Sequence, residues 1–195
     1  MILLREYQLT NAIQPSLRRP NVPENNNHNI IWNPPSRRFM KINVDAHVLR
    51  DGRCFSGMIL RRWDGSTVGI ATRAHQFVTD ALEGEALGLS DAIDMVESYN
   101  STDVIFELDN QVIVRAVQRR SQIRRQWGHA VQRCINFIKR NPRSSISWVS
   151  RKGNRVAHVL ARWAENNHIG DWPNWVPYCI HNHVLWDILW DMNHL

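Results

Sequence analysis

The sequence predicts a mixed α/β domain built on one sheet of about five strands, the first three antiparallel and the last two parallel. Three observations predict this class. Three strand-like segments follow one another and are joined by tight turns, which is typical of an antiparallel meander. A long segment with helical periodicity comes next. Short apolar strands and helical segments then alternate, which is the order that places parallel strands in one sheet.

The meander is indicated by a two-residue hydrophobic period. In Met40–Val48, apolar residues alternate with polar ones, as they do in a strand with one buried face. Cys54–Trp63 is a second strand candidate. Asp64-Gly65 is a strong hairpin signal, and it leads to a third strand at Thr67–Thr72.

The helical periodicity runs from about Thr79 to Tyr99, where apolar residues recur every three or four positions. Thr102–Asp109 is short and rich in β-branched and apolar residues, which favours a buried strand. The remaining predicted elements are a short helix at 111–117 capped by Asn110, a helix at 127–140, a strand at 145–149, and a helix capped by Asn154 that ends at Ala164.

These elements divide the chain of 195 residues into three parts. Residues 1–38 are rich in proline and asparagine, which break any period, so we expect a poorly ordered leader. Residues 39–166 are expected to form the domain. Residues 167–195 are rich in tryptophan, and we expect this C-terminal extension to pack on the domain surface.

Composition excludes several classes of protein. No stretch approaches the roughly 18 apolar residues that a membrane span needs, so no membrane partner is expected. The three cysteines form no C-x-x-C pair, which argues against a disulfide framework or a thiolate zinc site. We expect a monomer inside the cell, nuclear or cytoplasmic. An organelle stays open because residues 1–38 contain few acidic residues.

Positive charge is concentrated in one part of the chain. The net charge is +6, yet there is no Asp or Glu between Asn110 and Ala164, a segment with many Arg and Lys. Such a block repels itself unless a polyanion neutralises it, and a nucleic-acid backbone is the obvious partner. The alternative is a basic face that only aids solubility.

Three acidic residues stand where acids are unexpected. Asp45 lies in the middle of the first strand, Glu85 falls on the apolar stripe of the long helix, and Asp109 ends the buried fourth strand. Buried carboxylates are costly unless they are paired, protonated or bound to cations. Oxygen ligands suit Mg²⁺ or Mn²⁺, and such clusters cut phosphodiesters. Alternatively, Asp45 lies at an exposed strand edge and Asp109 caps a helix.

Four motifs, in this order, resemble the ribonuclease H superfamily, and specifically its plant-type branch, which is related to the ribonuclease H domains of retroelement reverse transcriptases. The motifs are WNPP followed by MKINVDA (32–46), LEGEALGL (82–89), VIFELDNQVIVRAV (104–117) and NRVAHVLARWA (154–164). The resemblance runs from about Trp32 to the C-terminus. It implies a ribonuclease H-like fold and metal-dependent endonucleolytic hydrolysis of RNA in RNA–DNA hybrids, with Asp45, Glu85 and Asp109 as the metal ligands.

The resemblance also implies roles for other residues. In the superfamily, the region after the third carboxylate can form a basic protrusion that grips the hybrid, and Arg119, Arg120, Arg124 and Arg125 are placed for this. His158 stands where the general pattern has a fourth catalytic aspartate, and the loop SRKGN (150–154) lacks a histidine that many active members carry. We expect His158 to belong to the catalytic site, either as a marginal fourth ligand or as a residue that contacts the ligands, because imidazole brings no negative charge and suits softer metals.

Two alternatives follow from these departures and from the tryptophan content. The first is a catalytically impaired, retroelement-derived module that binds nucleic acid without cutting it. The second is a protein-interaction domain that uses the tryptophan-rich extension. If the domain is an enzyme, we expect an aspartate at position 158 in place of the histidine to raise Mg²⁺-dependent activity.

Overall fold

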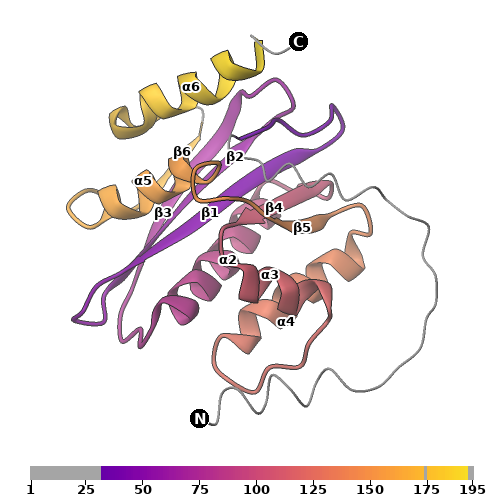
Figure 1. The fold of residues 1–195 in the computed structure, drawn as a ribbon, viewed down its shortest axis with the longest axis vertical. Coiled ribbons are helices and arrows are strands. Elements are labelled where there is room, and N and C mark those ends of the chain that lie inside the picture. The colour runs from indigo at the N-terminus through magenta and orange to yellow at the C-terminus, as the bar shows by residue number, and fades with distance from the viewer. Residues whose placement is uncertain (1–31, 174, 193–195) are drawn as a thin grey trace.

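The computed structural model describes residues 32–173 and 175–192. These residues form one mixed sheet with helices on both faces (Figure 1). The sheet has six strands in the order β5-β4-β1-β2-β3-β6. The predicted mixed α/β class is therefore confirmed.

The sheet begins with the expected meander. Its strands are β1 (Met40–Val48), β2 (Cys54–Arg61) and β3 (Thr67–His75). β1 pairs antiparallel with β2, and β2 with β3. β4 (Val104–Leu108) adds to the other side of β1 in parallel, and β5 (Ser145–Trp148) adds in parallel to β4.

The sixth strand was not predicted. β6 (Asp171–Pro173) pairs antiparallel with β3 at the edge of the sheet. It has only three residues and ends in a proline, so it carries no alternation that a sequence pattern could detect. Proline is tolerated on an edge strand because its missing N–H faces away from the ladder.

The helices form two layers. α2 (Ala81–Ser98), α3 (Gln111–Gln118) and α4 (Gly128–Arg140) share the larger hydrophobic cluster with one face of the sheet. On the other face lie α5 (Arg155–Ala164), the short 3₁₀ helix η1 (Tyr178–Ile180) and α6 (His181–Met192) (Figure 1).

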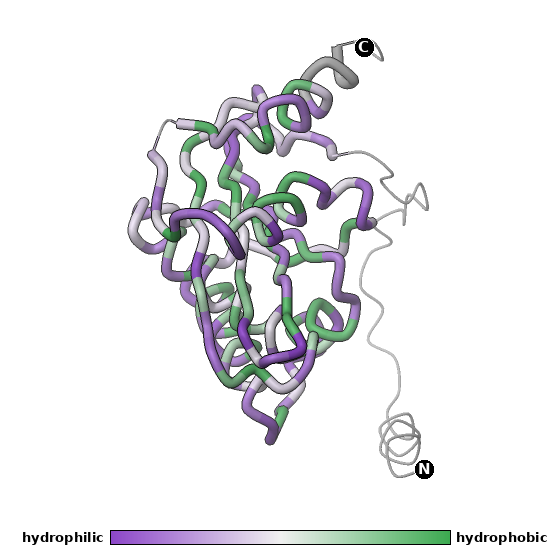
Figure 2. Tube along the Cα trace, turned by 90° about the vertical axis from the view of Figure 1, so that its left-hand side faces the viewer, coloured by the Kyte–Doolittle hydropathy of each residue, from purple (hydrophilic) through white to green (hydrophobic). Residues whose placement is uncertain are grey.

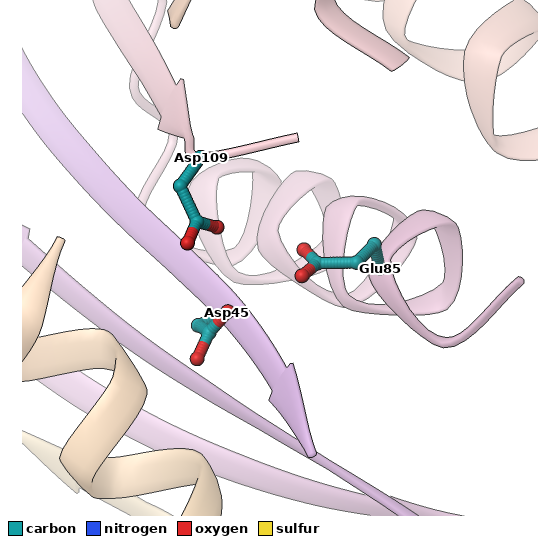
Figure 3. A group of neighbouring side chains, drawn as sticks. All are labelled: Asp45, Glu85 and Asp109. Atoms are coloured by element: carbon teal, nitrogen blue, oxygen red, sulfur yellow. The ribbon is translucent and has the colours of Figure 1, made fainter. Parts of the chain in front are cut away.

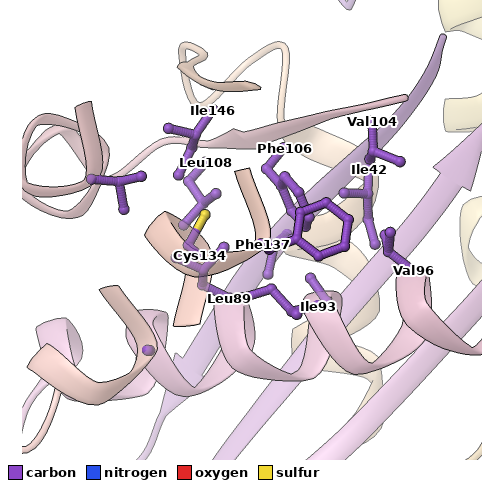
Figure 4. Packing of buried hydrophobic residues seen from close by; sticks show 14 of the residues in the cluster. Ile42, Leu89, Ile93, Val96, Val104, Phe106, Leu108, Cys134, Phe137 and Ile146 are labelled. Carbon is purple, nitrogen blue, oxygen red and sulfur yellow. The ribbon is translucent and has the colours of Figure 1, made fainter. Parts of the chain in front are cut away.

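The larger core lies between the sheet and α2, α3 and α4. Phe106 of β4 meets Phe137 of α4 edge to face, with ring centroids 5.4 Å apart (Figure 4). The smaller core packs α5, η1 and α6 against the sheet through Ile59, Ile70, Val156, Leu160, Ile180 and Val184. Hydrophobic (green) and hydrophilic (purple) residues alternate along the chain (Figure 2), as expected of helices and strands with one buried side.

The polar side chains of Lys41, Asn43 and Asp45 in β1 are buried too, because α5 packs on that face. Lys41 Nζ lies 2.8 Å from Glu107 Oε1 of the neighbouring strand. Asn43 Nδ2 donates to Glu107 Oε2 over 3.0 Å. Both side chains therefore have partners, which offsets the cost of burying polar groups in low-dielectric surroundings.

Arg61 extends this buried polar network to both ends of the described chain. Its side chain is fully buried, and its Nη1 donates to Asp187 Oδ2 of α6 over 2.7 Å. Its Nη2 donates to Asn43 Oδ1 over 2.9 Å. The guanidinium carbon lies 3.5 Å from the centroid of the Trp32 ring. The packed part of the chain therefore extends upstream of Phe39 to Trp32, and downstream to α6.

The leader expected at residues 1–38 falls mostly on residues 1–31, which lie outside the described residues. No helix in the described part of the chain is long and apolar enough to cross a membrane.

Candidate metal centre

Three carboxylates from distant parts of the sequence meet beside the sheet. Asp45 of β1, Glu85 of α2 and Asp109, which follows β4, each offer one oxygen, and these oxygens all lie within 4.8 Å of one another (Figure 3). Asp45 is almost fully buried and Asp109 is 13% exposed. The structure thus brings together the three acids that the sequence singled out.

The register of the parallel strands explains the meeting of the two aspartates. Val44 pairs with Leu108, the last residue of β4. Asp109 therefore leaves the sheet directly beside Asp45. Asn110 then caps α3 by accepting from the N–H groups of Val112 and Ile113, so the chain turns away at once and leaves the Asp109 carboxylate facing Asp45 (Figure 3).

Glycines let the two covering helices come close to the site. A Cβ at Gly84 of α2 would clash with the Val48 side chain of β1. A Cβ at Gly57 of β2 would clash with the backbone of Ala161 and Ala157 in α5. Because real Cβ atoms cannot approach this closely, only glycine permits the packing. The close approach of α2 brings Glu85 within reach of Asp45.

Electrostatics at the cluster favour a bound cation. Burial, and then the charges of Asp45 and Asp109, raise the pKa of Glu85 well above its usual range. Burial and the charge of Asp45 also raise the pKa of Asp109, although Arg151, 4.0 Å away, opposes the shift. A divalent cation would remove the repulsion that drives both shifts.

Two buried carboxylate oxygens provide a test of whether a metal fits. Glu85 Oε2 and Asp109 Oδ1 are buried and have no hydrogen-bond partner among the described residues. Buried acceptors are rarely left unsatisfied unless they serve a ligand. Three carboxylates that offer oxygen donors suit hard cations such as Mg²⁺ and Mn²⁺. The residues present therefore fit a divalent metal.

His158 lies next to the cluster, in the second turn of α5. Its Nδ1 is 2.6 Å from Asp45 Oδ2, so this nitrogen is engaged with a carboxylate. Within the described residues, the group whose donor atoms lie within ligand distance of one another consists of Asp45, Glu85 and Asp109 and does not include His158. The histidine is placed to orient Asp45.

Asn154 has a role that sequence reasoning missed. It was expected to cap α5, but its side chain makes no capping hydrogen bond. Instead its Nδ2 donates to the carbonyl oxygen of Val44 over 2.8 Å, and its Oδ1 accepts from Asn43 Nδ2 over 3.3 Å. Asn154 thereby fixes the start of α5 to the strand that carries Asp45. No sequence pattern distinguishes this tie from a cap.

The four arginines expected to contact nucleic acid lie on the connection between α3 and α4. Arg119, Arg120, Arg124 and Arg125 are exposed, and no salt bridge to any of them is found in the described part of the chain. In Figure 1 this connection lies at the end of the molecule away from α6. The four side chains are thus free to meet an anion.

The rest of the basic segment is partly neutralised by acids from elsewhere. Arg133 and Arg140 of α4 pair with Asp94 and Glu97 of α2, respectively, at 2.7 and 2.8 Å. Arg143 pairs with Asp103 at 2.8 Å. The basic segment therefore does not form a single block of unpaired positive charge in the folded protein, because acidic residues from other parts of the chain neutralise some of its arginines.

Comparisons with known proteins agree with this architecture. Residues 43–164 match the family model described as "Reverse transcriptase-like". The comparison with curated proteins gave no match. Solved structures with the same fold include ribonuclease H1 from Halobacterium salinarum NRC-1, with a TM-score of 0.60 and 17% identity over 67% of this chain and 99% of that one.

Two further structures were solved with nucleic acid. LC11-RNase H1, isolated from compost by a metagenomic approach, was solved in complex with an RNA/DNA hybrid; its TM-score is 0.55, with 15% identity over 62% of this chain and 92% of that one. The foamy viral protease-reverse transcriptase, also solved with an RNA/DNA hybrid, has a TM-score of 0.54 and 13% identity over 78% of this chain and 22% of that one. These likenesses show a ribonuclease H-like fold.

Proposed function

The chain belongs to the reverse transcriptase-like family, and on that premise we propose that it is a metal-dependent endonuclease that hydrolyses the RNA strand of RNA–DNA hybrids. The observation that carries the proposal is the convergence of three carboxylate oxygens within 4.8 Å from β1, α2 and the end of β4. The expected descent from the plant-type branch related to retroelements is part of the same proposal.

The chain's own residues would divide the work at the site. Asp45, Glu85 and Asp109 would hold Mg²⁺ or Mn²⁺ through their negative oxygens, and relief of their mutual repulsion would add to the affinity. When bound, the cation supplies positive charge at the scissile phosphate and lowers the pKa of water. His158 Nδ1, 2.6 Å from Asp45 Oδ2, orients that carboxylate, and Asn154 holds the backbone of β1 in place.

The exposed arginines supply the grip on the substrate. Arg119, Arg120, Arg124 and Arg125 would contact phosphates without reading base sequence. Selection of the hybrid would then rest on groove shape and on the 2′-hydroxyls of the RNA strand. The affinity is expected to fall steeply with salt because each neutralised phosphate releases counterions.

The proposal is tested with a hybrid whose RNA strand is labelled at one end. The purified protein is expected to cut the RNA in Mg²⁺ or Mn²⁺ and to stop when EDTA is added. Asp45→Asn should abolish cutting. Asp94→Asn is the matched control, because Asp94 is exposed and pairs with Arg133 away from the cluster. Equal activity in Asp45→Asn and the unaltered protein would refute the proposed site.

A second candidate is a module that binds hybrids without cutting them. The observation that favours it is the contact between His158 and Asp45, which uses one oxygen of the most buried carboxylate. Gel-shift measurements in EDTA separate the two functions. A silent module keeps its affinity for the hybrid in EDTA and releases no product in either metal, whereas the nuclease gives product.

A further inference from the structure

Two neighbouring hollows lie in the surface, and the first of them is lined by His158, which contacts the acidic cluster. The first has a volume of about 390 Å³ and is lined by Arg151, Lys152, Arg155, His158 and Val159. The second has a volume of about 290 Å³ and is lined by Lys152, Arg155, His183, Trp186 and Asp187. They share Lys152 and Arg155, so they form one continuous surface, called here the α5–α6 surface. It begins at His158, which contacts Asp45.

The charge of the α5–α6 surface is positive. Arg151, Lys152 and Arg155 are exposed. The only carboxylate among its lining residues is Asp187, and its charge is already matched by the buried guanidinium of Arg61 at 2.7 Å. The surface therefore offers an anion two cations without a salt-bridge partner among the described residues, Lys152 and Arg155, besides Arg151, which lies 4.0 Å from Asp109. A chain of phosphates fits this pattern.

Trp186 adds an exposed aromatic ring to the α5–α6 surface. Its side chain is 68% exposed. Its position on α6 is fixed by both neighbouring contacts: Val184 is buried in the smaller core, and Asp187 is bonded to Arg61. An exposed indole held beside cations is the combination that binds single strands, where each unpaired base can stack on an aromatic ring. Bases in a duplex already have both faces covered, so a single strand suits Trp186 better.

We propose that the α5–α6 surface binds a single-stranded flank of the nucleic-acid substrate, with a base stacked on Trp186 and phosphates held by Lys152 and Arg155. This inference rests on the proposed function and deepens it, because it names the part of the substrate that lies beyond the hybrid. The C-terminal segment then has a role in binding as well as in folding: α6 presents the tryptophan on the same surface that His158 lines at its other end.

The test measures the affinity of the full chain, in EDTA, for three hybrids of equal length: blunt, with a single-stranded flank, and with an abasic flank that keeps the phosphates. The flank should raise affinity, and the abasic flank should raise it less. Trp186→Ala should lose about 5- to 20-fold in affinity for the flanked hybrid only, and Trp186→Phe should regain most of it. Trp175→Ala is the matched control, since Trp175 is also exposed but lines neither hollow.

The phosphate contacts are tested separately by salt. Lys152→Ala with Arg155→Ala should lower the slope of log affinity against log salt by about 1.4 for the flanked hybrid, at about 0.7 for each lost single-strand phosphate contact. The blunt hybrid should keep its slope. A slope that is unchanged for the flanked hybrid would overturn the assignment of these two residues.

The remaining outcomes also decide the matter. If Trp186→Ala binds the flanked and abasic hybrids as tightly as the unaltered protein, the stacking is wrong, while metal-dependent cutting that requires Asp45 would leave the proposed function standing. If polyglutamate displaces the flank and Trp186→Ala has no effect, the surface takes an acidic protein instead. If the protein neither binds nor cuts any hybrid, both the proposed function and this inference fall.

Discussion

Replacing Glu85 by glutamine is expected to stabilise the metal-free protein. The Glu85 carboxylate has oxygens of Asp45 and Asp109 within 4.8 Å. At that distance, and with an effective dielectric constant of about 20, each pair of charges repels by about 3.5 kcal/mol. The actual cost of this repulsion is smaller, because the site takes up a proton and one of the carboxylates then carries no charge. We therefore expect a gain of about 1–3 kcal/mol at pH 8, less than the Coulomb sum.

The pH dependence has a definite sign. The pKa of Glu85 is raised by burial and by its two acidic neighbours, so the folded protein holds this proton more tightly than the unfolded chain. The free energy of unfolding therefore decreases as pH rises above about 4.3, the usual pKa of a glutamate, toward the raised value. Glu85→Gln lacks this titration, and its advantage over the unaltered protein should grow between pH 5 and pH 8.

The assay is thermal unfolding followed by circular dichroism, in EDTA and in Mg²⁺. In EDTA at pH 8, Glu85→Gln should melt about 2–12 °C higher, at about 2–4 °C for each of the 1–3 kcal/mol gained. Mg²⁺ should raise the melting temperature of the unaltered protein and have much less effect on the variant. Glu83→Gln is the control, because Glu83 accepts hydrogen bonds from Thr79 at the start of α2 and is expected to give no gain.

Two results would refute this reasoning. One is a melting temperature for Glu85→Gln in EDTA at pH 8 that is equal to or below that of the unaltered protein. The other is an equal response of both proteins to Mg²⁺. The first result would mean that Glu85 is not repelled by Asp45 and Asp109 in the metal-free protein, and the second that Glu85 does not take part in a cation site with them in solution.

Further outcomes are expected at the buried ion pair, the helix contact and the metal centre. Asp187→Asn leaves the cation of Arg61 buried without its partner and should cost about 3–5 kcal/mol, whereas Asp171→Asn breaks an exposed pair and should cost less than about 1 kcal/mol, both measured by urea unfolding. Gly84→Ala should push α2 from β1, cost about 1–3 kcal/mol, and slow hybrid cleavage, as timed gels would reveal. His158→Asp should raise the initial rate in Mg²⁺, and a slower rate would identify the histidine as the required group. The Mg²⁺ concentration needed for half-maximal thermal stabilisation should rise as pH falls, since protons compete for the carboxylates.

Much of the fold could be predicted because its signals are local. The alternation in β1, the Asp64-Gly65 turn and the helical period of α2 each depend on neighbours in sequence. The ends of the predicted elements fall within three residues of those observed, and differences of this size are expected where caps and turns compete. The three acids could be found because each breaks a local hydrophobic pattern.

What could not be predicted depends on contacts between distant residues. The salt bridge between Arg61 and Asp187 joins positions 126 apart, and the sequence around either residue gives no sign of its partner. Asn154 has the residue type of a helix cap, yet its side chain binds β1, 110 positions away. The positive charge of the basic segment is partly neutralised by acidic residues of α2, which lie close to it only in the folded chain. Sequence periodicity carries no information about such pairings.

The distance along the chain between Arg61 and its partner has a consequence for synthesis. At about 5–20 residues per second, Asp187 is made about 6–25 s after Arg61, since 126 residues separate them. Throughout that interval the guanidinium stays hydrated, because drying it without a counter-ion is too costly. In a nascent chain, the face of the sheet that α6 covers is therefore the last to pack. Ribosome-bound chains arrested before position 187 should remain sensitive to proteases on that face.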